Sequence, residues 1–173
     1  GLKHPIHYAK NADLVAMSPE ERQLFERTII QKMNGDDYSS IEDIINHTLK
    51  NNVSTLLIFN TKKTVDKIYE QIHQQTDRKC YYLTTNMCAQ HRLDNLAEIK
   101  KDLANEEPII VFSTQLIEAG VDIDFEKVIR SYAGIDSLVQ ANGRCNREGA
   151  RATKGQLWRV RLTDTDENTN SLK

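Results

Sequence analysis

The chain has 173 residues, of which 39% are apolar and 28% are charged, and this mix excludes collagen-like, low-complexity and wholly disordered proteins. A net charge of −2 excludes a global basic field, so any contact with nucleic acid must come from a local patch. The longest apolar runs have four residues (56–59 and 109–112), and the three cysteines form no C-x-x-C pair. We therefore expect a soluble, cytoplasmic protein without a membrane span, a disulfide framework or a thiolate zinc site.

Residues 1–52 are predicted to form an extension with two helices that leads into the main domain. Ser18, Pro19 and Glu21 are typical of a helix start, and the apolar spacing that follows predicts a helix over 18–33, ended by Asn34 and Gly35. Ser40 is expected to cap a second helix, whose apolar stripe runs from position 41 to position 49.

Strands and helices alternate from residue 53 onward. The apolar patterns predict helices over 62–75, 89–103 and 136–146, and strands over 55–59, 80–83, 109–113, 127–132 and 156–162. This alternation predicts an α/β domain over 53–163, with a mostly parallel sheet of about five or six strands and helices on both faces. Residues 164–173 are predicted to be a solvated tail.

Polar residues follow the predicted strands, at the edge where ligands bind to open parallel sheets. They form the loops 60–61, 84–86 and 113–115 and the turn 133–136. Their hydroxyl and amide groups suit contacts with a phosphate backbone, but the same residues are also common helix caps and turn formers. The sequence leaves both interpretations open.

The segment after the third strand of the main domain presents three polar residues at four-residue intervals, Thr114, Glu118 and Asp122. On a helical turn these side chains would share one side, and Gly120 would permit a tight bend. The spacing fits a carboxylate site and a capped surface turn equally well.

A basic stretch begins in the last predicted helix. Gln140, Arg144 and Arg147 would lie on one face of a helix over 136–146, and arginine forks suit phosphate because they bind it bidentately. Residues 144–161 contain six Lys or Arg and one acid, Glu148, which is the local basic patch that the net charge hides.

The order of these motifs resembles motifs IV to VI of superfamily 2 helicases. The stretch 111–122 resembles motif V, residues 140–147 resemble motif VI, and residues 56–61 resemble motif IV. Three segments are similar to those of the CRISPR-associated helicase-nuclease of type I systems. They are STQLIEAGVDIDF, DSLVQANGRCNREG and, between motifs IV and V, TTNMCAQHR. The resemblance covers about residues 50–150 and implies a RecA-like three-layer sandwich.

The resemblance also implies roles for individual residues. Arg144 and Arg147 would reach the γ-phosphate of ATP held by a first RecA-like domain, with Arg147 as the arginine finger. Gln140 would orient the phosphate, and Gly120 and Asp122 would belong to the ATP site. Contacts with the backbone of single-stranded DNA would come from Thr61, Thr85 and Thr114.

Two motifs of such enzymes are absent from these 173 residues, a Walker A loop and an adjacent His-Asp pair. We therefore expect half of an ATP-dependent helicase that is inactive alone, without metal ligands of its own, while the full-length protein uses ATP and Mg²⁺. The expected partners are the first RecA-like domain, single-stranded DNA and a CRISPR RNA-guided surveillance complex. The alternatives are a superfamily 2 helicase outside CRISPR defence, a non-catalytic RecA-like module that binds nucleic acid or protein, and a flavodoxin-like domain.

Overall fold

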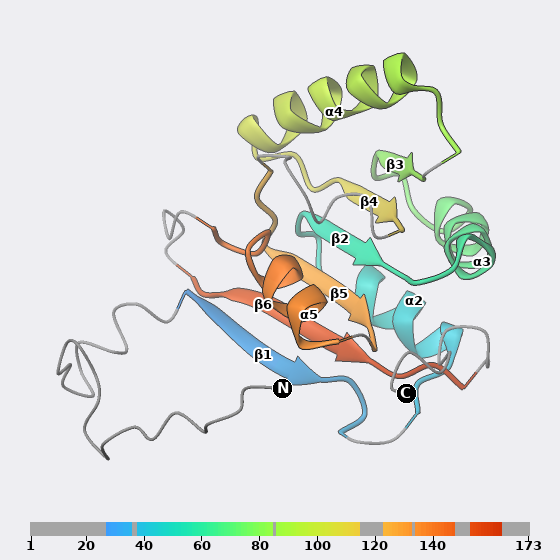
Figure 1. The fold of residues 1–173 in the computed structure, drawn as a ribbon, viewed down its shortest axis with the longest axis vertical. Coiled ribbons are helices and arrows are strands. Elements are labelled where there is room, and N and C mark those ends of the chain that lie inside the picture. Colours follow the sequence, from blue (N-terminus) through green and yellow to red (C-terminus); the bar gives the residue numbers. More distant parts are fainter. Residues whose placement is uncertain are drawn as a thin grey trace, which may run out of the picture.

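The computed structural model describes residues 27–35, 38–84, 86–114, 123–132, 134–147 and 153–163. The strands in these ranges form one six-stranded sheet in the order β1-β6-β5-β2-β4-β3, with all neighbouring pairs parallel (Figure 1). They are β1 (Thr28–Lys32), β2 (Thr55–Ile58), β3 (Cys80–Leu83), β4 (Ile110–Ser113), β5 (Lys127–Ser131) and β6 (Gly155–Val160). The predicted α/β class and the mostly parallel sheet are confirmed.

Helices cover both faces of the sheet and make the predicted three layers (Figure 1). On one face, α2 (Ile41–Leu49) and α3 (Lys62–His73) bury Ile44 and Ile68 against the strands. On the other face, α4 (Ala89–Ala104) and α5 (Ile135–Asn142) contribute Ile99 and Ala141 to a second core. Every residue of β2, β4 and β5 is buried, because these strands lie in the middle of the sheet with helices above and below.

The helix predicted over 18–33 is wrong in the part that the structure describes, since Thr28–Lys32 is the edge strand β1. Residues 28–30 are β-branched and suit an extended chain, and the exposed edge of β6 offers them backbone partners. The Met33 N–H continues this pairing by donating to Arg159 O at 3.0 Å. Residues 18–26 lie outside the described ranges.

The second N-terminal helix is confirmed as α2, with the capping box at Ser40. The Asp43 N–H donates to Ser40 Oγ at 3.1 Å, and the Ser40 N–H donates to Asp43 Oδ2 at 2.8 Å. Because β1 and α2 belong to the same sheet and core as the later elements, residues 27–52 are part of one folded unit with them. The division of the chain into 1–52, 53–163 and 164–173 stays a prediction.

The helix predicted over 136–146 is too long, because α5 ends at Asn142. Gly143 follows as the C-cap, and Asn146 has a left-handed backbone with φ of 46°. Cys145 instead forms an isolated parallel bridge with Phe125, just before β5. The remaining predicted elements are present with ends that differ by up to two residues.

None of the described helices is both long enough and apolar enough to cross a membrane.

Candidate functional site

The carboxyl ends of the strands carry two of the three predicted DNA-binding threonines. Thr61 caps α3, since its Oγ1 accepts from the Thr64 N–H at 3.3 Å, which confirms the helix-cap interpretation for this residue. Thr114 is buried at the end of β4, and its hydroxyl has no hydrogen-bond partner among the described residues. Thr85 lies outside the described ranges.

A fully buried arginine organises the same edge between β2 and β5. Arg130 Nη1 donates to Asn60 Oδ1 at 2.8 Å and to Ser131 Oγ at 3.0 Å, and the Asn60 amide donates to Tyr132 O at 3.0 Å. The chain turns toward β3 after β2 and toward β6 after β5, so this is the switch point at which open α/β sheets bind ligands. Arg130 is not among the site residues predicted from the sequence. Its only signal there is a charged residue that follows two apolar residues of a predicted strand.

The loop that carries Arg144 and Arg147 lies at the opposite edge, beside the amino ends of β5, β6 and β1. The Phe125 N–H donates to Arg144 O at 2.9 Å, and the Arg147 N–H donates to Asp124 Oδ1 at 2.8 Å. The Asn146 amide donates to Arg27 O at 3.0 Å and to Thr153 O at 3.3 Å. The loop is therefore tied to three neighbouring segments of the chain.

The two arginines of this loop differ in exposure. Arg144 is only 8% exposed as a residue, whereas Arg147 is exposed at the wall of a cavity of about 370 Å³. Thr28, Asn142 and Asn146 also line this cavity. A cavity of this size accommodates part of a nucleotide, and Arg147 is the loop arginine able to meet a ligand there.

The predicted arrangement of Gln140, Arg144 and Arg147 on one helical face is wrong. Gln140 is exposed on the last turn of α5, but both arginines follow the helix end, so helical spacing does not relate the three side chains. Glu118, Gly120 and Asp122 lie outside the described ranges.

The basic stretch 144–161 is also not one patch, because β6 separates its two ends. Arg144, Arg147 and Lys154 lie near the amino end of this strand, and Arg159 and Arg161 lie at its carboxyl end. A strand of six residues is about 20 Å long, so the two basic groups face different edges of the sheet.

Gly155 is a further residue that positions the arginine loop. A Cβ at this position would lie 2.7 Å from Cys145 Sγ and 2.8 Å from Asn146 Cβ, which is too close for either contact. The first residue of β6 must therefore be glycine for the loop to pack where it does. Neither Gly155 nor Asp124 stands out in the sequence, because both act through contacts between distant segments.

The described residues contain no group of three or more His, Cys, Asp or Glu side chains that could hold a metal ion.

The fold is that of a RecA-like helicase domain, the class to which its structural neighbours belong. Cas3 from T. fusca superposes with a TM-score of 0.68 at 15% identity, covering 82% of this chain and 19% of that one. The C-terminal domain of the DEAD-box protein Dbp5 superposes with a TM-score of 0.61 at 14% identity, covering 83% of this chain and 82% of that one.

The sequence comparisons identify the family within this class. Residues 51–150 match the model of "CRISPR-associated nuclease/helicase Cas3, C-terminal", and the chain belongs to this family. A Cas3 nuclease/helicase from Methanothermobacter thermautotrophicus is 29% identical over 169 residues, which are 96% of this chain and 19% of that protein. A Cas3 nuclease/helicase from Haloferax volcanii is 46% identical over 76 residues, 42% of this chain and 8% of that protein. The chain thus spans about a fifth or less of these relatives' length.

Proposed function

We propose that this chain is the second RecA-like domain of an ATP-dependent superfamily 2 DNA helicase that acts in CRISPR antiviral defence. In this proposal, the amino edge of the sheet completes an ATP site, and the carboxyl edge contacts single-stranded DNA. The exposure of Arg147 on a loop held by Asp124, at the wall of a cavity, is the observation that carries the proposal.

Arg147 is proposed as the arginine finger. Its backbone is held through Asp124, while its side chain extends from a loop outside any helix. A guanidinium there could enter an ATP site built by a neighbouring domain and stabilise the charge that develops on the transferred phosphoryl group. Because Arg144 is buried, we propose that it supports this loop. Gln140, Gly120 and Asp122 remain proposed members of the ATP site.

The DNA contacts are proposed for Thr61, Thr85 and Thr114 at the carboxyl edge. The Thr114 hydroxyl, which has no hydrogen-bond partner in the described part of the chain, supports this assignment, since a buried hydroxyl without a partner is costly unless a ligand or a movement of the edge satisfies it. Contacts of this kind recognise the sugar-phosphate backbone and are independent of sequence.

The other components of the enzyme are proposed to lie outside this chain. A first RecA-like domain would bind the ATP phosphates and supply the Mg²⁺ ligands, and a CRISPR RNA-guided complex in the cytoplasm would load the enzyme on DNA. We therefore expect the isolated chain to show no ATP turnover. Turnover by the isolated chain that Arg147→Ala abolishes would contradict this assignment.

The test is ATP hydrolysis by the longer protein that contains this chain, measured with and without single-stranded DNA. We expect Arg147→Ala to lower the stimulated rate by roughly 10³- to 10⁵-fold, the usual contribution of an arginine finger. Arg147→Lys should fail to restore the rate, because an ammonium group lacks the planar fork of donors.

The matched control is Arg92→Ala on α4, far along the sheet from the arginine loop. It removes the same side chain and should leave the rate within about twofold of the wild type. Equal rates for the wild type and Arg147→Ala would show that Arg147 does not contact the transferred phosphate.

A further inference from the structure

Three basic residues occupy one row across the carboxyl ends of three neighbouring strands. Lys32 of β1 is the register partner of Arg159 of β6, and Arg159 is the partner of Arg130 of β5. Partners in a parallel pair point to the same face of the sheet, here the face that α5 covers. Three cationic side chains on one face therefore give this end of the sheet a local positive potential, which attracts anions.

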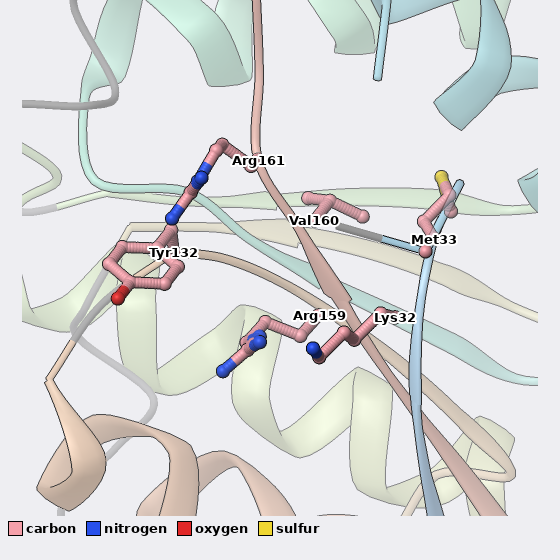
Figure 2. Close-up of a pocket in the computed structure, with 7 residues that line it drawn as sticks. Lys32, Met33, Tyr132, Arg159, Val160 and Arg161 are labelled. Carbon is pink, nitrogen blue, oxygen red and sulfur yellow. The ribbon is translucent and has the colours of Figure 1, made fainter. Parts of the chain in front are cut away.

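Tyr132 and Arg161 lie beyond this row, just after the ends of β5 and β6. Figure 2 shows the Arg161 guanidinium directed at the Tyr132 ring, 4.8 Å from its centroid, with Arg159 at 5.5 Å from the same ring. An arginine over an aromatic face keeps its N–H donors in the guanidinium plane, where they can bind an anion. The ring therefore holds two guanidinium groups close together without neutralising either.

The hollow beside these side chains has a volume of only about 20 Å³ and is lined by Lys32, Tyr132, Arg159 and Arg161, together with Met33, Gly35 and Val160. Figure 2 shows the four polar side chains among them. This volume admits a water molecule but no sugar or base. A ligand must therefore lie across the rim and touch the charged ends of the side chains. A phosphodiester group of a chain that passes over the edge fits this shape, and an enclosed small molecule does not.

The row is continuous with the predicted DNA contacts. Thr114 follows β4, Thr61 follows β2, and the sheet order β4-β2-β5-β6-β1 leads from them past Tyr132 to Arg159 and Lys32. Four strand spacings of about 4.8 Å make an edge of about 19 Å, which several nucleotides can cross.

We infer that Arg159 and Arg161 at the Tyr132 ring, together with the neighbouring Lys32, form a binding site for the phosphodiester backbone of single-stranded DNA, beyond the threonine loops. This inference rests on the proposed function and extends the proposed track from the middle of the sheet to β6 and β1. The site is independent of base sequence, because all of its donors address phosphate oxygens.

The experiment measures binding of the 173-residue chain to a fluorescein-labelled oligo-dT of 20 nucleotides by anisotropy, at several NaCl concentrations. The double variant Lys32→Gln with Arg159→Gln should bind at least tenfold more weakly at 100 mM NaCl. Two lost phosphate contacts should also reduce the slope of log K against log salt by about 1.4, because each contact with a single strand contributes about 0.7.

The matched control is Lys100→Gln with Lys101→Gln, which removes two exposed charges from α4. It should change the affinity less than threefold and leave the slope unchanged. Circular dichroism of each variant confirms that the fold is retained. Equal affinity and slope for the two double variants would overturn the inference.

A further variant separates this inference from the proposed function. If Thr114→Val weakens binding and the Lys32 and Arg159 variant does not, the site is wrong while the threonine track stands. The ATPase test of Arg147 is independent of all these outcomes.

Discussion

His47 on α2 is half-buried between the Trp158 ring and two lysines. The ring centroids of His47 and Trp158 lie 4.3 Å apart, and Lys127 Nζ donates to His47 O at 3.1 Å. Burial, together with the charges of Lys127 and Lys50, lowers the pKa of His47 to about 4. Burial also lowers the pKa of Lys127 to about 8. Both groups at the contact between α2 and the sheet therefore bind a proton less readily than they would in water.

This pKa predicts that the protein loses stability in mild acid. Between pH 6.5 and pH 4, His47 is mostly protonated in the unfolded chain and mostly neutral in the folded chain. The unfolded state binds more protons, so the free energy of unfolding falls as the pH falls. At pH 5 we expect a loss of about 1 kcal/mol after allowing for partial exposure, or a Tm lower by about 2–4 °C than at pH 7.

The check is thermal unfolding of the wild type and His47→Phe, which keeps a ring beside Trp158 but does not titrate. The variant should show a smaller fall in Tm between pH 7 and pH 5, since all other groups are shared. An identical fall in both proteins would assign the acid sensitivity to other residues.

At the scale of elements, the start of β6 and the arginine loop depend on each other through Gly155. Gly155→Ala places a methyl group within 3 Å of Cys145 Sγ and Asn146 Cβ, so either the strand or the loop must move. We expect a loss of about 1–3 kcal/mol in the free energy of unfolding, measured by urea denaturation. Gln156→Ala, at the next position on the same strand, should cost less than 1 kcal/mol.

The same substitution should act on function through Arg147. In the longer protein, Gly155→Ala should lower DNA-stimulated ATP hydrolysis at temperatures where the fold is intact, because the loop no longer holds Arg147 in place. An ATPase rate equal to that of Gln156→Ala would mean that the loop position is unimportant for the reaction.

Most elements of the sheet could be predicted from the sequence, because β2 and β4 each contain three consecutive apolar residues and apolar residues recur at helical spacing in the helices between the strands. The edge strand β1 could not, since the spacing of residues 24–33 also fits a helix and only pairing with β6 makes these residues extended. The end of α5 was missed because it depends on the bridge between Phe125 and Cys145, residues far apart in sequence.

The site residues proposed from the sequence stay a prediction, and the geometry around them could not be read from the sequence. The motif wording points to Arg144 and Arg147, yet the burial of one and the exposure of the other follow from the contacts of the loop with Phe125 and Asp124. The sequence likewise suggested one basic patch over residues 144–161. The length of β6 shows that the two ends of this stretch lie at opposite edges of the sheet.

At the scale of the whole molecule, the N-terminal elements are part of the core. Met33, Ile44 and Ile45 are at most 4% exposed and pack in the same cluster as Leu57 and Phe112. Each buried side chain of this size contributes about 1.5–3 kcal/mol, so the three together approach the total stability of a typical domain.

Removal of these elements should therefore unfold the rest. We expect a chain that begins at residue 53 to lack cooperative unfolding, whereas a chain that begins at residue 27 should retain a single transition, as measured by circular dichroism during heating. A stable fold for residues 53–173 would show that the predicted boundary at residue 53 separates an independent unit.

The strand β6 joins the two edges of the sheet mechanically. Gly155 touches the arginine loop, and Arg159, four residues on, stands at the far end of the same extended strand. A rotation of this domain by about 10° around the arginine loop would carry the far end of a strand about 20 Å long through about 3.5 Å. That displacement equals about one rise per nucleotide in a duplex strand, so under the proposed function a tilt of this size would have the amplitude of a single-nucleotide step along the proposed track.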